Sequence, residues 1–140
     1  MKSVMIVAED AYMVGIYTRA FEASGYDVVH MQSAEVCLER LSEERPSAIV
    51  LSLVLEQMNG FSLLEQLRVH PNASTVPAFV LTRLSDRSDI RRCHELGCRG
   101  YFIKPHARPT DLLQALEREL GGSQERMVFK LPHQEASIAA

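Results

Sequence analysis

Five polar side chains that could do chemistry each follow a short apolar run, at four widely separated points of the chain. They are Glu9, Asp10, Ser52, Thr82 and Lys104. Carboxylate and hydroxyl oxygens can hold a hard divalent cation such as Mg²⁺. A serine beside a carboxylate base, with a lysine to stabilise negative charge, could instead act as a nucleophile. Either chemistry requires the fold to bring these groups together.

The elements that would position these groups alternate between strand and helix. Short apolar runs predict strands over residues 4–8, 26–31, 48–53, 78–82 and 100–103, and helix-spaced apolar residues follow each run. The run 48–53 is apolar on both faces, as expected for a parallel strand covered by helices on each side. Five strand and helix pairs therefore predict an α/β fold, a five-stranded parallel sheet with helices on both faces. Ligand sites in such folds lie at the carboxyl ends of the strands, where the five polar groups stand.

Length and composition exclude several other classes of protein. The chain has 140 residues, 46% of them hydrophobic, which suits one folded domain rather than a disordered chain. Its longest strongly apolar run, 48–55, is far too short to cross a bilayer. The N-terminus lacks the long apolar core of a secretory signal, and three cysteines are too few for a disulfide framework. We therefore expect a cytoplasmic protein without a membrane partner.

Charge is unevenly distributed along the chain. Lys and Arg total 15 against 18 Asp and Glu, and this net charge of -3 argues against binding to nucleic acid. Residues 83–108 nevertheless contain seven basic and three acidic residues, whereas residues 1–82 contain five and ten. A solvated helix face is the simplest interpretation of this basic segment, and an acidic protein partner is the functional one.

Motifs at the predicted strand ends resemble one known family. The acidic pair Glu9-Asp10, the helix start Asn59-Gly60, Thr82, Tyr101 and the pair Lys104-Pro105 follow one another as in the receiver domains of two-component response regulators. The resemblance implies a flavodoxin-like (βα)5 fold, with a receiver-like domain over residues 1–121 and a C-terminal tail over 122–140 that we expect to be flexible. In active receivers the acidic pair holds Mg²⁺, an aspartate on the third strand accepts a phosphoryl group, and the threonine and lysine bind its oxygens.

One position departs from the receiver pattern at its centre. Counting back eight residues from Gly60, the spacing to the phospho-accepting aspartate in such receivers, leads to Ser52. A serine hydroxyl cannot form an acyl phosphate, and it needs a base to act as a nucleophile. The resemblance therefore indicates a degenerate acidic pocket. Its members are Glu9, Asp10, Ser52, Thr82, Arg83 and Lys104.

Charge in this pocket predicts poor metal binding. The three carboxylates and one lysine of an active receiver sum to -2, whereas Glu9, Asp10 and Lys104 sum to -1. Hard oxygen sites bind cations according to the number of charged ligands, so we expect no cofactor, with Mg²⁺ weakly bound at Glu9 and Asp10 or absent. The guanidinium of Arg83 could pair with one of these acids or point into water.

The resemblance and the departure together predict a signalling module that is not an enzyme. We expect an atypical single-domain response regulator, a pseudo-receiver that acts by protein–protein interaction without aspartyl phosphorylation. Two alternatives remain open. A small hydrolase could use Ser52 as nucleophile, Asp10 as base and Lys104 as stabiliser, although the sequence VLSLV around Ser52 lacks a Gly-x-Ser-x-Gly turn. A receiver could also be regulated by phosphorylation of Ser52 itself.

An output face is predicted where the basic segment meets the receiver pattern. In receivers the fourth helix, fifth strand and fifth helix commonly form the output or dimer face, and an aromatic residue three positions before the lysine reports the signalling state. The residues expected there are Tyr101, Arg87, Arg91 and Arg92. Arg87 and Arg91 are four apart, on one side of a helix. We expect an acidic protein partner, either another signalling protein or a second copy in a homodimer, to bind this face.

Overall fold

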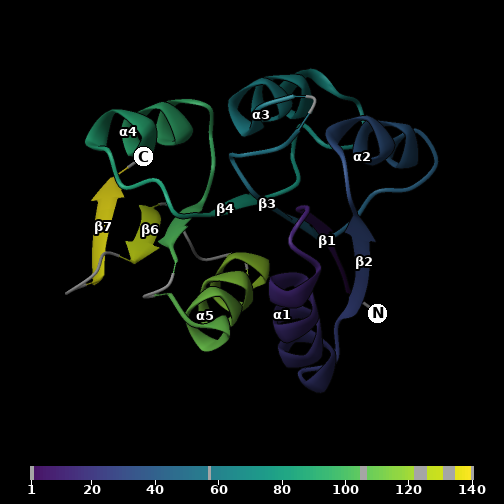
Figure 1. Ribbon diagram of the computed structural model, residues 1–140, viewed down its shortest axis with the longest axis horizontal. Helices are drawn as coiled ribbons and strands as arrows, with labels where there is room; N and C mark the ends of the chain where they lie inside the picture. Colours follow the sequence, from purple (N-terminus) through teal and green to yellow (C-terminus); the bar gives the residue numbers. More distant parts are fainter. Residues whose placement is uncertain (1, 57, 105–106, 122–125, 131–134, 140) are drawn as a thin grey trace.

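Strands and helices alternate along the chain in the computed structural model, as Figure 1 shows. Residues 2–56, 58–104, 107–121, 126–130 and 135–139 are described. The strands are β1 (Ser3–Val7), β2 (Asp27–Met31), β3 (Ala48–Leu51), β4 (Ala78–Thr82), β5 (Gly100–Ile103), β6 (Arg126–Lys130) and β7 (Glu135–Ala139). The helices are α1 (Ala11–Ala23), α2 (Ala34–Leu41), α3 (Gly60–Val69), α4 (Arg87–Glu95) and α5 (Pro109–Leu120). No helix within these ranges is long and apolar enough to cross a membrane.

The strands form one sheet in the order β2-β1-β3-β4-β5-β6-β7. Neighbours from β2 to β6 pair in parallel, because a helix returns the chain to the start of each next strand, and β7 pairs antiparallel with β6. Val7 pairs with Leu51 and Thr82 with Ile103, so the residues after these strands emerge at one edge of the sheet. The predicted flavodoxin-like fold is confirmed, with two strands in addition to the predicted five.

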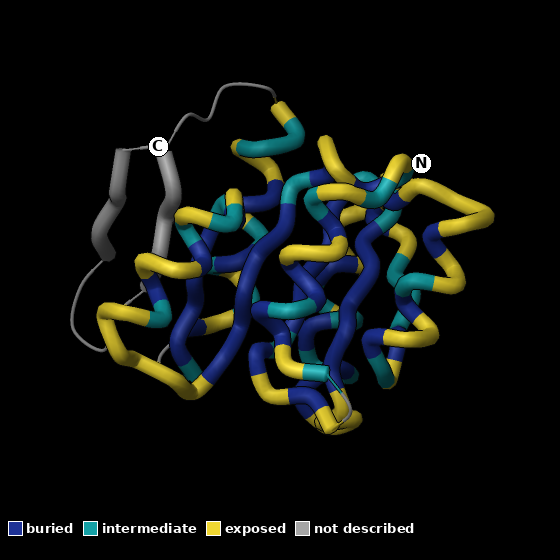
Figure 2. Tube along the Cα trace, turned by 90° about the horizontal axis from the view of Figure 1, so that it is seen from above, coloured by how far each residue is buried: buried dark blue, intermediate teal, exposed yellow. Residues whose placement is uncertain are grey.

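Helices cover both faces of the sheet, and each face has its own apolar core. The helices α1 and α5 lie on one face, and α2, α3 and α4 lie on the other (Figure 1). Alternate strand residues point to opposite faces, so Val7 joins the core under α2 to α4 and Ile6 joins the core under α1 and α5. Every residue of β3 and β4 is buried, as Figure 2 shows for the centre of the sheet. Their sequences are therefore apolar without alternation.

Side-chain caps fix where the helices beside the pocket begin. Asp10, Ser33 and Asn59 precede α1, α2 and α3, and each accepts the backbone N–H three residues later, at 3.2, 3.2 and 2.9 Å. The chain therefore turns from strand into helix soon after β1 and β2, and again after the longer loop that follows β3. Gly97 ends α4 with a φ of +85°, a conformation that favours glycine, and the chain then enters β5.

Residues beyond α5 continue the sheet where we expected a flexible tail. Gly100 of β5 pairs with Val128 of β6, and Phe102 pairs with Lys130. Without β6, the strand β5 would be an edge with unpaired backbone groups, and α5 returns the chain to that edge. The sheet therefore extends past residue 121, the predicted end of the domain.

Candidate functional site

A pocket of about 280 Å³ opens at the carboxyl ends of β1, β3, β4 and β5. The side chains of Ala8, Met13 and Val54 form the apolar part of its lining. The rest of the lining is Glu9, Asp10, Ser52, Thr82, Arg83 and Lys104. The fold thus brings together all six residues that the sequence analysis assigned to one pocket.

Both acids of the pocket accept hydrogen bonds from the backbone. Asp10 Oδ1 accepts the N–H of Met13 at 3.2 Å and caps α1. Glu9 Oε2 accepts the N–H of Glu56 at 2.5 Å, which ties the loop after β1 to the loop after β3. Each carboxylate therefore stabilises local structure with one of its oxygens.

Ser52 lies directly after β3, and its N–H and its hydroxyl both make hydrogen bonds nearby. Its N–H donates to Val7 O at 2.9 Å. Its hydroxyl donates to Val54 O at 3.3 Å and accepts the N–H of Val54 at 3.2 Å. Gly60 at the start of α3 packs on this loop so closely that a Cβ there would lie 2.7 Å from Ser52 O and 2.6 Å from Leu53 Cα. A side chain at position 60 would push the Ser52 loop out of place.

Lys104 and Arg83 supply the positive charge of the pocket. The backbone N–H of Lys104 donates to Thr82 O at 2.7 Å, which fixes the start of its side chain beside β4. Burial lowers the pKa of Lys104, the nearby carboxylate of Asp10 raises it, and Arg83 lowers it. Arg83 lines the pocket but is exposed, and no ion pair joins it to Glu9 or Asp10 in the described part of the chain.

Thr82 and Tyr101 are joined through the backbone of Leu84. The Thr82 hydroxyl accepts the N–H of Leu84 at 3.2 Å, and the Tyr101 hydroxyl donates to Leu84 O at 2.9 Å. Tyr101 is fully buried, and burial raises its pKa above the ordinary value of 10.0. The ring of Tyr101 therefore points inward, which is one of the two rotamers expected of an aromatic that reports the signalling state, and its part in an output face stays a prediction. Its hydroxyl contacts the loop that holds Leu84.

The three arginines predicted on the output face separate in the structure. Arg87 and Arg91 are exposed on α4. Arg92 turns instead to α3, where its guanidinium carbon lies 4.4 Å from the centre of the Phe61 ring and its Nη2 lies 3.5 Å from Glu65 Oε1. Arg92 remains exposed despite these contacts with α3, and its place on one output face with Arg87 and Arg91 stays a prediction.

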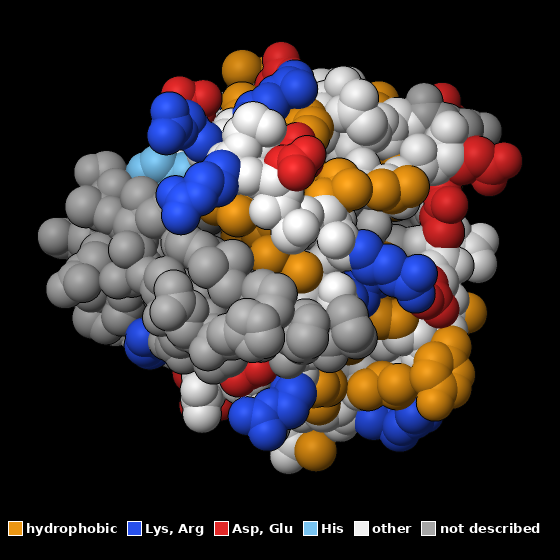
Figure 3. All heavy atoms as spheres, turned by 60° about the vertical axis from the view of Figure 1, so that its left-hand side comes forward, with side chains coloured by type: hydrophobic (Ala, Val, Ile, Leu, Met, Phe, Trp, Pro, Cys, Tyr) orange, Lys and Arg blue, Asp and Glu red, His pale blue; other side chains and the backbone are white. Residues whose placement is uncertain are grey.

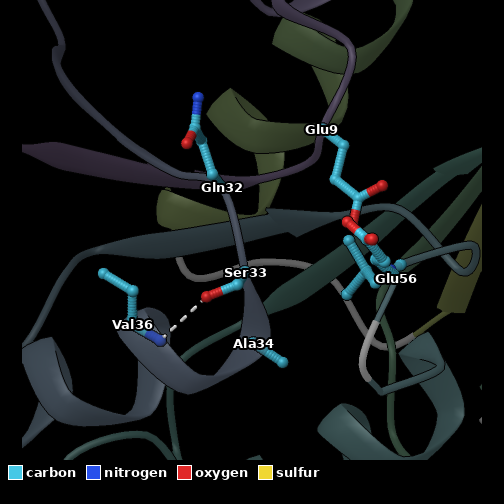
Figure 4. Close-up of a pocket in the computed structure, with 7 residues that line it drawn as sticks. Glu9, Gln32, Ser33, Ala34, Val36 and Glu56 are labelled. Atoms are coloured by element: carbon cyan, nitrogen blue, oxygen red, sulfur yellow. Dashed lines mark hydrogen bonds between the residues drawn. The ribbon is translucent and has the colours of Figure 1, made fainter.

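A second hollow, of about 380 Å³, adjoins the pocket and shares Glu9 with it (Figure 4). Its lining also comprises Gln32, Ser33, Ala34, Val36, Leu55 and Glu56. Figure 4 shows the carboxylates of Glu9 and Glu56 side by side, and Ser33 turned toward the backbone of Val36. From the sequence, Ser33 was expected only to cap a helix, and no site residue was predicted after the second strand. Gln32 and Ser33 could have been found there by applying the strand-end rule to that strand as well.

Known proteins share this arrangement. A family model, the response regulator receiver domain, matches residues 4–117. The chain belongs to the response regulator receiver family. This receiver is 26% identical over 120 residues to the polar-differentiation response regulator DivK of Brucella anthropi, and the match covers 86% of this chain and 97% of DivK. It is therefore a receiver domain of two-component signalling.

Solved structures agree with the receiver fold. A putative response regulator from Chloroflexus aurantiacus has a TM-score of 0.80 and 26% identity to this receiver, with 86% of this chain and 98% of that one covered. The receiver domain of sensor histidine kinase PA1611 from Pseudomonas aeruginosa has a TM-score of 0.78 at 21% identity, covering 86% and 98% of the two chains. That structure has a magnesium ion coordinated in its active site cleft.

Proposed function

We propose that this receiver is a pseudo-receiver, which signals through protein contacts and is not switched by aspartyl phosphorylation. The proposal rests on the hydrogen bonds of the Ser52 hydroxyl, directly after β3. Its hydroxyl donates to one atom of Val54 and accepts from another, so both its donor and an acceptor site serve the loop. A hydroxyl used in this way supports a structural role.

The arrangement also argues against the hydrolase alternative. A serine nucleophile needs a base within hydrogen-bond distance, usually a histidine that a third group orients. No histidine is among the described residues that line the pocket. Of the two acids after β1 that line the pocket, Asp10 already accepts the N–H of Met13 and Glu9 that of Glu56. We therefore propose that the chain is not an enzyme.

The residues of the pocket do not fit Mg²⁺. This ion requires close to octahedral coordination by oxygen, and its sites are built around carboxylates. Here Glu9 and Asp10 each accept a backbone hydrogen bond, and the two positive charges of Lys104 and Arg83 line the same cavity. The formal charges therefore cancel, and Ser52 contributes only a neutral oxygen. We propose that Mg²⁺ binds weakly or not at all.

The exposed side of α4 is the surface that we propose for a protein partner. Arg87 and Arg91 lie four residues apart, which places them on one side of the helix. Neither belongs to an ion pair among the described residues. Figure 3, which brings this side of the molecule forward, shows Lys and Arg side chains grouped on it. An acidic protein surface, including that of a second copy of this chain, would complement them.

A partner on α4 could act on the pocket through the loop between β4 and α4. Leu84 lies in this loop, bonded to Thr82 on one side and Tyr101 on the other. A partner that prefers one position of α4 would shift the population of loop conformations, and the two hydroxyls would follow. We propose that binding of a partner to α4, and not phosphorylation, changes the positions of the Thr82 and Tyr101 hydroxyls.

Phosphoryl analogues test the loss of phosphorylation. Beryllofluoride with Mg²⁺ should leave the amide NMR signals of Thr82, Tyr101 and Lys104 unchanged, because no carboxylate stands at position 52. The variant Ser52→Asp is the matched control, since it restores a third carboxylate and should raise the affinity for Mg²⁺. Shifts of the three signals in the wild-type protein would contradict the proposal. Phosphate found on Ser52 in protein purified from cells would favour the serine-regulated alternative.

Charge reversal tests the partner surface. Sedimentation of the chain alone measures binding to a second copy, and binding through arginines should weaken as salt is added. Arg87→Glu with Arg91→Glu should abolish that association. Arg19→Glu on α1, which is also exposed, should leave it unchanged. If the variant with both arginines of α4 reversed still associates like the wild type, the contact lies on another surface.

A further inference from the structure

The end of α4 brings two cysteines together below the surface. The N–H of Gly97 donates to His94 O at 2.9 Å, and the N–H of Cys98 donates to Cys93 O at 3.0 Å. These bonds form a helix-ending turn in which the first and sixth residues place their side chains in contact. The two thiols are hydrogen-bonded to each other. The turn therefore holds Cys93 and Cys98 as a pair.

The surroundings of the pair differ from those of the third cysteine. Cys93 and Cys98 are 0% and 2% exposed. The hydrogen bond that Cys93 makes to Cys98 and the burial of the side chain raise the pKa of Cys93, so that Cys93 stays a thiol. Cys37 is also buried, but it packs against Met5 Sδ at 3.6 Å in another part of the core.

A fixed positive charge lies beside the pair. The guanidinium of Arg68 donates to Ser74 O at 3.3 Å and to Val76 O at 3.2 Å. A Cβ at Gly97 would lie 3.5 Å from Arg68 Cδ, so this side chain rests on the turn that joins the cysteines. The buried Nε of Arg68 has no hydrogen-bond partner among the described residues, and its charge interacts with Cys98. Cys98 is therefore the cysteine of the pair that lies beside this positive charge, and we take it as the one that reacts first.

We propose that Cys93 and Cys98 form a redox-active dithiol, which a small hydroperoxide converts into a disulfide. The Cys98 thiolate attacks the peroxide oxygen, the O–O bond breaks, and the leaving oxygen takes a proton, which leaves Cys98 as a sulfenic acid. Cys93 Sγ then attacks Cys98 Sγ, the S–O bond breaks, and water leaves with the proton of Cys93. Two thiols lose two electrons and two protons, and hydrogen peroxide is reduced to two molecules of water. Burial favours a small oxidant over a bulky disulfide.

Such a bond would tie the last turn of α4 to the start of β5. Cys93 lies on the buried side of the helix whose other side carries Arg87 and Arg91. The inference stands on the geometry of the turn and does not depend on the proposed loss of phosphorylation. Oxidation would then change α4 through a covalent bond, without any ligand bound in the pocket.

Peptide mass spectrometry tests the proposal directly. Trypsin cleaves after Arg92 and Arg99, so both cysteines fall in one peptide, residues 93–99, whereas Cys37 falls in the peptide 20–40. The folded chain is treated with hydrogen peroxide, then denatured and blocked with N-ethylmaleimide before digestion. We expect peptide 93–99 to change from doubly alkylated to unalkylated and about 2 Da lighter than the dithiol, reversibly with dithiothreitol, while Cys37 stays alkylated.

The alkylation of peptide 93–99 is compared between the wild type and three cysteine variants. Cys37→Ser should still give the unalkylated peptide, and Cys93→Ser or Cys98→Ser should not. The proposal is overturned if wild-type peptide 93–99 remains doubly alkylated, if it carries sulfinic or sulfonic acid without a disulfide, or if Cys37 pairs with either cysteine. These wild-type readings hold even if a serine variant fails to fold.

Discussion

The two sides of the carboxyl-end pocket use their polar groups differently. On the side of β1 and β3, each polar side chain bonds to backbone close by: Ser52 to Val54 in its own loop, Asp10 to the first turn of α1, and Glu9 to the N–H of Glu56 in the next loop. On the side of β4 and β5, two hydroxyls from different strands meet at one residue, Leu84. The first side therefore holds its own loops in shape, and the second side connects a strand to the start of a helix.

This difference shows that the pocket keeps its shape with a serine, not a carboxylate, at position 52. The Ser52 loop is held by packing and by hydrogen bonds that need no carboxylate. The link from Thr82 to Tyr101 also needs none, because both hydroxyls bind backbone atoms. The hydrogen bonds of Ser52 and the link from Thr82 to Tyr101 thus involve separate residues, and each can be tested alone.

The packing of Gly60 on the Ser52 loop should give the largest effect. In Gly60→Ala the added Cβ would lie under 3 Å from the backbone of residues 52 and 53, and the loop or α3 must move. Overpacking of this kind costs about 1–3 kcal/mol. Urea denaturation should show that loss in the free energy of unfolding.

Gly15→Ala in α1 is the matched control for this change. The nearest atom to a Cβ at Gly15 is Arg19 Nη1, at 3.8 Å, so the methyl group fits. Alanine is better than glycine inside a helix by about 0.8–1.0 kcal/mol, and this variant should therefore be more stable than the wild type. Equal effects of the two substitutions would contradict the close contact at Gly60.

On the other side of the pocket, Tyr101→Phe should give a smaller loss. The variant keeps the buried ring and removes the bond to Leu84 O, which costs about 0.5–1.5 kcal/mol. Amide NMR shifts should concentrate at Leu84 and Thr82 if the two hydroxyls are coupled through that residue. Tyr12→Phe is the control, since Tyr12 is 79% exposed and should change neither stability nor these signals. Amide shifts that occur only in β5 would show that Tyr101 and Thr82 are not coupled through Leu84.

The same hydroxyl should make stability depend on alkaline pH. The folded pKa of Tyr101 is raised by burial, so above pH 10.0 the unfolded chain loses this proton while the folded chain keeps it. The stability that the protonated Tyr101 contributes is complete below that pH and is lost as pH rises through the folded pKa. Wild type should therefore lose more unfolding free energy than Tyr101→Phe between about pH 8 and about pH 11. Parallel pH profiles would show that Tyr101 is not buried.

Removal of the Ser52 hydroxyl should give the smallest effect. Ser52→Ala loses two long hydrogen bonds to Val54 near the surface, and surface substitutions usually change stability by no more than about 0.5 kcal/mol. The signals of Thr82 and Tyr101 should not move, because they belong to the other side of the pocket. A large shift at Tyr101 would show that the two sides are coupled after all.

The sequence predicted most of the fold and the six polar and charged residues of the pocket, for identifiable reasons. The strands that position the pocket are short and mostly apolar, and Ser33 and Asn59 mark helix starts. Parallel topology then sends every strand end to one edge, so the position of a residue after a strand is enough to place it in the pocket.

Contacts between distant elements could not be predicted in this way. Arg92 follows Arg91 along the helix, and only the packing of α4 against α3 shows that Phe61 draws it away. Likewise, whether β5 is an edge depends on where the chain goes after α5, and residues 126–130 gave no local signal strong enough to decide. Pairing of this kind is fixed by the whole sheet.

Gly60 limits what a sequence comparison can infer about activity. A receiver with an acceptor at position 52 and a receiver without one would both need glycine here, because the close contact is with backbone atoms of residues 52 and 53, which every amino acid possesses. The same holds for Asn59, which caps α3 whatever the pocket binds. The Asn59-Gly60 pair is therefore a marker of how the chain turns, and by itself it does not indicate phosphotransfer.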